Sequence, residues 1–244
     1  MGVVGGPGAV FAVLGPVGAK DVVELSFQAT RLEISATSQF ARYVTAVALE
    51  GDIGALTTVC VNGKDLVNAV ACCESAVRLG IVYDADAALV HLTGTEDEVI
   101  DFGCAIHAIH VEPHWLELGA AIAKIKMDTE IMYLAFLQCV DSSAGPVRLQ
   151  LRNDAGMALA TSWQNGCETS VTVPASLMEI SALPAGGLEL SIPAKELLMI
   201  TGLLSVIGGP GGMKTEMSVT ELGVRFVRKV LTGFDSYLDI LAAT

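Results

Sequence analysis

Two stretches of the chain nearly repeat one another. Residues 34–39 read Ile-Ser-Ala-Thr-Ser-Gln, and residues 158–164 read Ala-Leu-Ala-Thr-Ser-Trp-Gln. A second pair follows in the same order, with Val-Asn-Gly-Lys-Asp-Leu at residues 61–66 and Ile-Pro-Ala-Lys-Glu-Leu at residues 192–197. Internal self-similarity is the signature of repeated structural units. The two pairs of similar segments, which we call the two echoes, occur in the same order in both halves of the chain. This order predicts a duplicated domain.

Short strand-like runs dominate the rest of the sequence, and few segments show helical periodicity. We expect strands at residues 22–27, 32–36, 43–49, 79–83, 88–92, 99–106, 131–140, 147–152, 157–161, 169–173, 188–191, 216–219, 223–229 and 237–241. We expect helices at residues 9–19, 63–75, 114–127 and 193–207. This pattern predicts the α+β class, with two domains at 1–111 and 112–244, each having two helices packed on antiparallel sheets.

The charge of the chain limits how it can bind nucleic acid. It has 244 residues, 14 Lys and Arg, 27 Asp and Glu, and a formal net charge of −13. Affinity for DNA comes largely from Lys and Arg that neutralise phosphates, so a general DNA-binding surface is excluded. Any DNA contact must be confined to a small basic zone.

Hydropathy and cysteine spacing indicate the cellular compartment of the protein. The strongest apolar runs, such as residues 197–207, are shorter than the roughly 20 residues that span a bilayer. No Lys or Arg precedes Lys20, so the charged start of a signal peptide is missing. We expect a cytoplasmic protein without a membrane partner. The six cysteines have no C-x-x-C spacing, which favours free thiols: Cys60, Cys72, Cys73, Cys104, Cys139 and Cys167.

Several segments resemble DNA sliding clamps. Residues 226–237, Phe-Val-Arg-Lys-Val-Leu-Thr-Gly-Phe-Asp-Ser-Tyr, are similar to a bacterial β clamp segment that reads aromatic, basic, Leu, Gly, Phe, Tyr. Residues 61–64 and 192–195 resemble the entry into the second helix of each clamp domain, and residues 32–37 the strand and turn before it. The family usually has a basic residue before the Phe and a Pro after it, where this chain has Gly233 and Asp235.

The length of the chain departs from the bacterial pattern. Bacterial β clamps have three domains per chain and dimerise, whereas this chain has room for two. A ring of six domains then requires three chains, as in eukaryotic, archaeal and some bacteriophage clamps. The resemblance thus implies a homotrimeric processivity factor of DNA replication, bacterial or phage-like, that encircles double-stranded DNA independently of its sequence. Its implied partners are a replicative DNA polymerase and a clamp loader ATPase, with no enzymatic activity and no cofactor.

The resemblance also implies three sets of functional residues. Helical lysines would line the bore and face DNA: Lys20, Lys64, Lys124, Lys126 and Lys195. A pocket for partner peptides maps by position to Phe40, Tyr43, Ile109, Val111, Leu231, Leu241 and Ala242. Edge strands at residues 99–106 and 167–173 would join the subunits through Ile100, Phe102 and Val171. Each set also fits an ordinary role, as solvated lysines, core residues or buried strands.

Other readings of the sequence stay open. A β-rich structural or assembly protein of a virus, a polymerase accessory factor that forms no ring, and an enzyme with two similar domains could each contain such a repeat. His107, His110 and His114 beside Glu112 have a spacing that could bind a metal, although no Cys accompanies them. The glycine runs at residues 5–8 and 208–212 lack the G-x-x-x-x-G-K-[ST] spacing of a phosphate loop. No nucleophile–base arrangement is evident.

Overall fold

The computed structural model describes residues 2–4, 22–50, 56–73, 76, 78–96, 100–111, 115, 117–140, 145–162, 168–197, 199, 214–231 and 234–243. The chain divides into two compact units. The first unit comprises Met1–Ser38 and Tyr43–Trp115, and the second comprises Gln39–Arg42 and Leu116–Thr244. Among the described residues, no helix is both long and apolar enough to cross a membrane.

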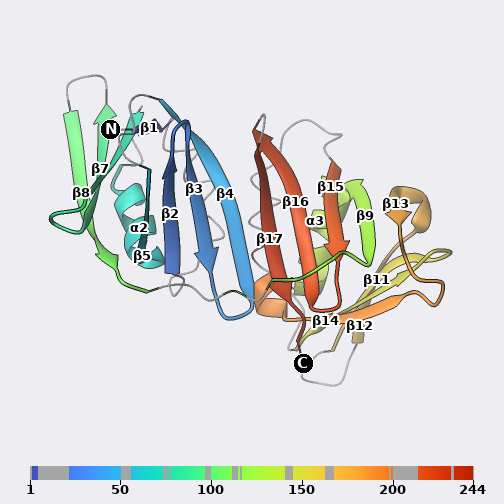
Figure 1. The fold of residues 1–244 in the computed structure, drawn as a ribbon. Coiled ribbons are helices and arrows are strands. Elements are labelled where there is room, and N and C mark those ends of the chain that lie inside the picture. Colours follow the sequence, from blue (N-terminus) through green and yellow to red (C-terminus); the bar gives the residue numbers. More distant parts are fainter. Residues whose placement is uncertain are drawn as a thin grey trace. The chain divides into compact units, whose positions relative to one another are not determined.

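The first unit is mainly antiparallel sheet with one described helix (Figure 1). Hydrogen-bonded neighbours follow the order β1-β6-β7-β8-β5-β2-β3-β4, and helix α2 packs on β5 and β8. The elements are β1 (Gly2–Val4), β2 (Val22–Gln28), β3 (Arg31–Thr37), β4 (Ala41–Glu50), β5 (Thr57–Asn62), α2 (Gly63–Ala71), β6 (Arg78–Asp84), β7 (Leu89–Glu96) and β8 (Ile100–Ile109).

The second unit contains two groups of antiparallel strands and helix α3. One group has the order β17-β16-β15-β9-β13, and the other has the order β12-β11-β10-β14. A further helix begins at Ala194. The elements are β9 (Ala123–Asp128), α3 (Thr129–Val140), β10 (Val147–Arg152), β11 (Gly156–Ser162), β12 (Glu168–Val173), a 3-10 turn (Ala175–Leu177), β13 (Met178–Ser181), β14 (Leu188–Ile192), β15 (Lys214–Val219), β16 (Gly223–Leu231) and β17 (Phe234–Leu241).

Both units repeat one topology. The pairings β2–β3, β2–β5, β6–β7 and β7–β8 of the first unit have the counterparts β10–β11, β10–β14, β15–β16 and β16–β17 in the second. At the buried centre of β2, Leu25 pairs with Val59, and at the buried centre of β10, Leu149 pairs with Leu190. Val59 and Leu190 are therefore equivalent positions.

The strand register also corrects the alignment of the first echo, residues 34–39 with residues 158–164. The same two leucines, Leu25 and Leu149, pair on their other sides with Ile34 and Leu159. Two residues further along each strand, Ala36 is therefore the counterpart of Thr161. Aligning the threonines of the two echoes instead shifts one strand by a single residue, which would turn its buried side chains to the opposite face.

The predicted helix at residues 114–127 is wrong where the structure describes it. Ala123, Ile125 and Met127 are buried while Lys124 and Lys126 are exposed, which is the two-residue alternation of a strand. This segment forms β9. Upstream, Gly119 has a positive φ of 78°, a conformation that ends regular helix.

The predicted strand at residues 131–140 is also wrong, because these residues belong to helix α3. The Asp128 carboxylate accepts a hydrogen bond from the Glu130 backbone N–H at 2.8 Å and so caps the helix start. Met132, Ala135, Phe136 and Cys139 are buried, the spacing of one helical face. The segment is apolar on its other side as well, which hid this period in the sequence.

The remaining predictions differ in smaller ways. The helix expected at residues 63–75 ends at Ala71, and the one expected at 193–207 begins at Ala194, with all but one of its residues after Leu197 lying outside the described part. The helix expected at residues 9–19 lies wholly outside it. The other predicted strands are present with small changes of bounds, and β1, β5, β9 and β13 were missed.

Helix α3 anchors the core of the second unit. The Phe136 ring meets the Phe226 ring of β16 edge to face, with centroids 5.4 Å apart and planes at 85°. Neither side chain is exposed to solvent. Phe226 pairs with Met217, which pairs with Ile125, so these three side chains line the sheet face that α3 covers.

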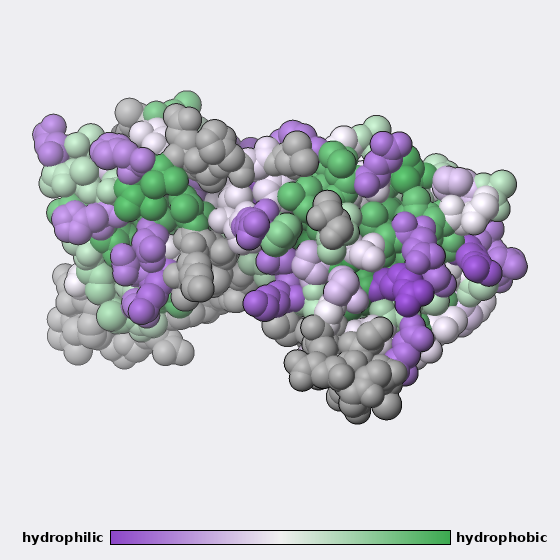
Figure 2. All heavy atoms as spheres, turned by 90° about the horizontal axis from the view of Figure 1, so that it is seen from below, coloured by the Kyte–Doolittle hydropathy of each residue, from purple (hydrophilic) through white to green (hydrophobic). Residues whose placement is uncertain are grey.

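Away from the core, hydrophobic residues lie in separate groups among hydrophilic ones on the face drawn in Figure 2.

Replacing Phe136 with Ala should lower the free energy of unfolding by about 3–5 kcal/mol, because it leaves a cavity against Phe226. Leu134→Ala is the matched control, since Leu134 is on the same helix and 47% exposed. We expect the control to change stability by about 0.5 kcal/mol or less. Urea unfolding followed by circular dichroism measures both, and equal losses would contradict this packing.

Candidate binding surfaces

Two of the predicted DNA-facing lysines occupy equivalent positions. Lys64 lies five residues after Val59 and Lys195 five residues after Leu190, so the strand register makes them counterparts. Each is exposed in the first turn of a helix, Lys64 in α2 and Lys195 in the helix that begins at Ala194. In the first unit the Asn62 side chain caps that turn, accepting from the Lys64 N–H at 3.0 Å.

The other predicted lysines do not share this position. Lys124 and Lys126 were assigned to a helix, but they are on β9 and point to the sheet face opposite α3. Lys124 forms an ion pair with Glu216 at 3.4 Å. On the same face Lys214 contacts Glu179, and this hydrogen bond, together with the nearby Lys126 charge, lowers the pKa of the Glu179 carboxyl. Lys20 lies outside the described residues.

The predicted subunit-contact strands are edges among the described residues. β12 has β11 as its only described partner. β8 pairs with β7 along its length, but with β5 only at residues 108 and 109. Ile100 and Phe102 are in the part of β8 whose other side has no described partner, and Val171 is half-buried in β12. Among the described residues, both strands are therefore sheet edges.

Part of the predicted partner pocket comes together in the second unit. The Leu241 N–H donates to the Phe40 carbonyl at 2.8 Å, and the Ala242 N–H donates to the Leu222 carbonyl at 2.8 Å. The Phe40 and Leu222 side chains are both exposed. We call Phe40, Leu222, Leu241 and Ala242 the apolar patch. Sequence reasoning missed Leu222, because only its exposure and its backbone contact with Ala242 mark it.

Leu231, predicted to share that pocket, is at the opposite end of its hairpin. It pairs with Phe234, whereas Leu241 pairs with Gly223, eight residues away along β16. At about 3.3 Å per residue the two ends are roughly 26 Å apart. Leu231 therefore does not belong to the patch.

The other predicted pocket residues are in the first unit. Tyr43 is buried in β4, and Ile109 pairs with Cys60 at the end of β8. Val111 is exposed just beyond that strand. Their membership of a partner pocket stays a prediction.

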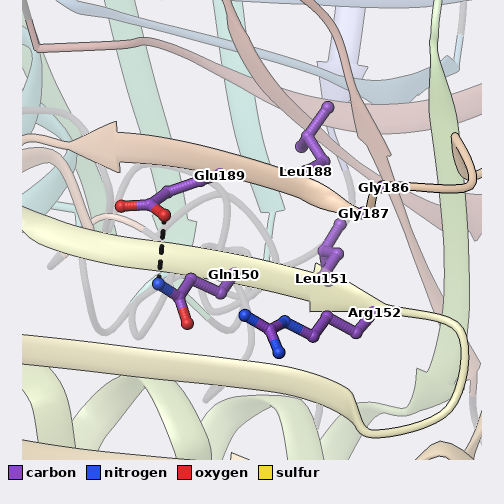
Figure 3. Close-up of a pocket in the computed structure, with 7 residues that line it drawn as sticks. All are labelled: Gln150, Leu151, Arg152, Gly186, Gly187, Leu188 and Glu189. Atoms are coloured by element: carbon purple, nitrogen blue, oxygen red, sulfur yellow. Dashed lines mark hydrogen bonds between the residues drawn. The ribbon is translucent and has the colours of Figure 1, made fainter.

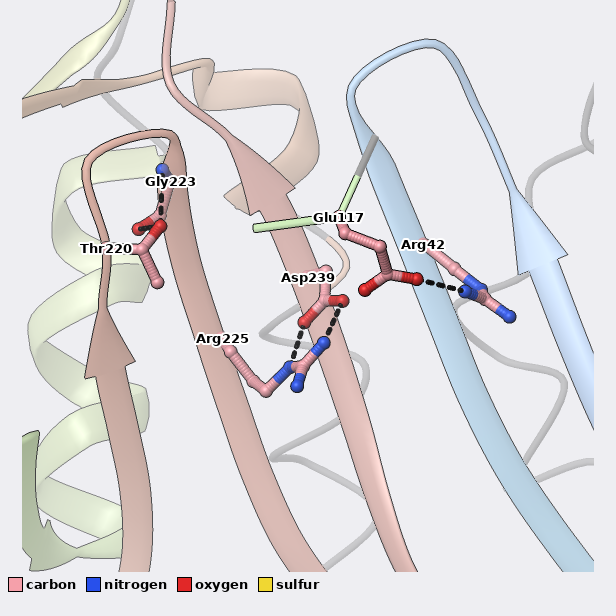
Figure 4. A network of polar contacts seen from close by, with 6 residues as sticks. All are labelled: Arg42, Glu117, Thr220, Gly223, Arg225 and Asp239. Atoms are coloured by element: carbon pink, nitrogen blue, oxygen red, sulfur yellow. Dashed lines mark hydrogen bonds and ion pairs between the residues drawn. The ribbon is translucent and has the colours of Figure 1, made fainter. Parts of the chain in front are cut away.

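The turn that carries Leu222 is fixed by Thr220 and Gly223 (Figure 4). The Thr220 hydroxyl accepts from the N–H groups of Leu222 and Gly223 at 3.2 and 3.1 Å. A Cβ on Gly223 would lie 2.0 Å from the Ile240 carbonyl oxygen, so only glycine fits here. The turn holds Leu222 outward next to β17.

An ion pair between half-buried Arg225 and buried Asp239 lies on the same hairpin. The Arg225 guanidinium donates two hydrogen bonds to Asp239, Nε to Oδ1 at 2.6 Å and Nη2 to Oδ2 at 2.7 Å (Figure 4). It also lies over the Tyr237 ring, 4.8 Å from the ring centroid. The Asp239 side chain is 0% exposed. These hydrogen bonds raise the pKa of Arg225. Close by, Arg42 pairs with Glu117 at 3.8 Å.

A small cavity of about 120 Å³ lies between the end of β10 and the start of β14 (Figure 3). Gln150 donates to Glu189 across it at 3.0 Å. Its lining contains no nucleophile paired with a base: Gln150, Leu151, Arg152, Gly186, Gly187, Leu188 and Glu189. In the described part of the chain, no cluster of three or more His, Cys, Asp or Glu residues is arranged to hold a metal ion. Glu112, His114 and the two glycine runs lie outside that part.

Comparison with known proteins gives a structural relationship only. No protein-family model matches the chain, and no curated protein sequence matches it. The crystal structure of Proliferating Cellular Nuclear Antigen from Entamoeba histolytica matches 100% of this chain and 98% of its own, with a TM-score of 0.78 and 11% sequence identity. The chain has the clamp fold. The predicted α+β class with antiparallel sheets is thus confirmed, whereas function must be argued from the residues.

Replacing Arg225 with Met should destabilise the clamp fold by about 3–5 kcal/mol, because Asp239 is left as a buried charge without a partner. Adding Asp239→Asn to that variant removes the charge, so the double variant should recover part of the loss. Urea unfolding of the two variants and the wild type completes the comparison. If the double variant were less stable than Arg225→Met, the buried charge would not be the cause.

Proposed function

We propose that this protein is a DNA sliding clamp, a ring of three identical chains that encircles duplex DNA and tethers a replicative polymerase. The observation that carries the proposal is the match of the whole chain to a clamp fold, built from two units of one topology. Such a protein acts as a scaffold and needs no catalytic group. The two units would be the two clamp domains.

Closure of the ring is supported by two strands that are sheet edges among the described residues, β8 and β12. In the second unit, the Leu241 N–H of β17 donates to the carbonyl of Phe40, the residue before β4. β8 is the first unit's counterpart of β17, and β12 is the second unit's counterpart of β4. A backbone contact between β8 of one chain and β12 of the next would cover an edge of each of these strands. Repeated head to tail, this contact generates a closed ring when the rotation closes.

Six such domains in a ring correspond to three chains of this length. A trimer contains three copies of α2 and three copies of the helix that begins at Ala194, and each has an exposed lysine in its first turn, Lys64 or Lys195. These lysines would face the DNA, and their contacts with phosphate would be weak and independent of sequence. Lys20 stays a candidate for this lining. Lys124 and Lys126 are left out because they are on the sheet face opposite α3.

The apolar patch is the proposed docking site for the polymerase. Its exposed Phe40 and Leu222 side chains could receive the aliphatic or aromatic anchors of a short peptide. A closed ring also requires a loader ATPase to open it. The bacterial or bacteriophage type, which residues 226–237 favour in the sequence, remains a prediction.

The assembled protein should have three times the chain mass of 25.4 kDa by light scattering. After loading by the clamp loader of its own cell, it should remain on nicked circular DNA and be lost when that DNA is cut, because a closed ring leaves only by a free end. A monomer or dimer would instead indicate an accessory factor without a ring. A trimer that stays on circles and linear DNA equally would contradict topological binding.

The double variant Lys64→Ala, Lys195→Ala should weaken binding to linear duplex DNA and reduce its salt dependence. Each lost phosphate contact should make the slope of log K against log salt shallower by about 0.9. Lys124→Ala, Lys126→Ala is the matched control, with two lysines removed from β9, and its slope should equal that of the wild type. Fluorescence anisotropy at several salt concentrations measures the slopes, and a larger effect from the control pair would reverse the assignment.

A further inference from the structure

Three thiols that are distant in the sequence lie together in the first unit. Cys72 and Cys73 directly follow helix α2, and Cys104 is in β8. The Cys104 thiol is in hydrogen-bond contact with both. Cys72 is exposed, Cys73 is buried, and Cys104 is half-buried. All three are free thiols in this structure.

A glycine in the neighbouring strand makes room for this cluster. Cys104 pairs with Leu92 of β7, so the Cys104 side chain shares a sheet face with Leu92 and with Gly94, two residues further along. A Cβ on Gly94 would lie 3.1 Å from the Cys73 Cβ, 3.4 Å from its Sγ and 2.8 Å from the Ala76 Cβ. Without a side chain at position 94, the end of α2 can approach the sheet beside Cys104.

The positions of the three thiols limit which disulfide they can form and do not favour metal binding. No group of potential ligands among the described residues is arranged to hold a metal ion, so metal binding is not favoured. A bond between the adjacent Cys72 and Cys73 would join residues whose Cα atoms are about 3.8 Å apart across a trans peptide. Disulfides usually join Cα atoms about 4.4–6.8 Å apart. Cys104 is therefore the suitable partner for either of them.

We propose that Cys72 and Cys104 form a thiol–disulfide exchange site, whose co-reactant is a small-molecule disulfide of the glutathione type. The exposed Cys72 thiolate attacks one sulfur of the small disulfide, forming a mixed disulfide and releasing one small thiolate, which takes up a proton. The Cys104 sulfur, as its thiolate, then attacks the Cys72 sulfur and releases the second small thiol. Two cysteine thiols and one small disulfide thus yield one Cys72–Cys104 disulfide and two small thiols.

Burial of Cys104 determines the pace of the second step. Burial and the neighbouring thiols raise the pKa of the Cys104 thiol, and burial also raises the pKa of Cys73. Both are protonated at neutral pH, and a thiol must lose its proton before it attacks. Closure of the disulfide should therefore accelerate as the pH rises. The product would tie the end of α2 to β8, and this inference does not depend on the proposed clamp function.

The test uses the full-length chain, fully reduced and then exposed to oxidised glutathione. Alkylation of the remaining thiols and mass spectrometry should show two thiols lost, no retained glutathione, and a peptide link between Cys72 and Cys104. A chain that keeps all its thiols, stops at a mixed disulfide on Cys72, or links other cysteines overturns the proposal. This mapping needs no variant and so does not depend on a variant folding.

Variants then assign the two positions. Cys104→Ser should halt the reaction with one glutathione on Cys72, and Cys72→Ser should abolish the internal link. Cys73→Ser is the matched control, because it removes the adjacent thiol of the same cluster and should leave the Cys72–Cys104 link intact. Persistence of a link in Cys72→Ser, or its loss in a folded Cys73→Ser protein, would assign the exchange to Cys73 and overturn the pairing proposed here.

Discussion

Backbone hydrogen bonding at the edges of the sheets is the constraint on which this structure depends. A strand edge presents N–H and C=O groups that pair with another strand or stay in water, and long unpaired edges promote association. In the described residues, β12 and most of β8 keep one such edge. Phe40, the residue before β4, shows the alternative, because its carbonyl accepts a hydrogen bond from Leu241. In the described residues, the edges of β8 and β12 are therefore the ones to which the proposed assembly assigns a partner strand.

The proposed ring would reconcile the negative charge of the chain with DNA binding. A molecule with net charge −13 gains little affinity from its general surface. A ring does not need high affinity, because it is retained by topology, and weak contacts allow it to slide. The strand register places Lys64 and Lys195 at equivalent helix starts, so duplication would multiply one lysine into a periodic lining. The acidic remainder of the surface then reduces binding of DNA elsewhere.

The sequence predicted the strands and the repeat better than it predicted the first helix of the second unit. Alternating burial makes short strands readable, and the second echo matched the strand register because it spans a strand-to-helix junction capped at Asn62. The segment from residue 114 to 140 was reversed, since α3 is apolar on both sides and β9 carries lysines at alternate positions. That reversal also misplaced Lys124 and Lys126. The thiol cluster was invisible, because Cys72 and Cys104 become neighbours only through the packing of α2 on β8.

The two units share a topology but differ in the solvent exposure of their last strands, β8 and β17. On the outward face of β8, Gly103, Ala105 and His107 are exposed. On β17, which has the corresponding place in the second unit, Asp239 is fully buried and held by Arg225. A buried carboxylate is tolerated only with such a partner. The outward face of β8 is therefore exposed to solvent, whereas the same face of β17 has a buried and ion-paired carboxylate. The same hairpin begins at Gly223, next to exposed Leu222. Rigidity there would keep the apolar patch in a single arrangement, which reduces the ordering cost of binding a flexible peptide.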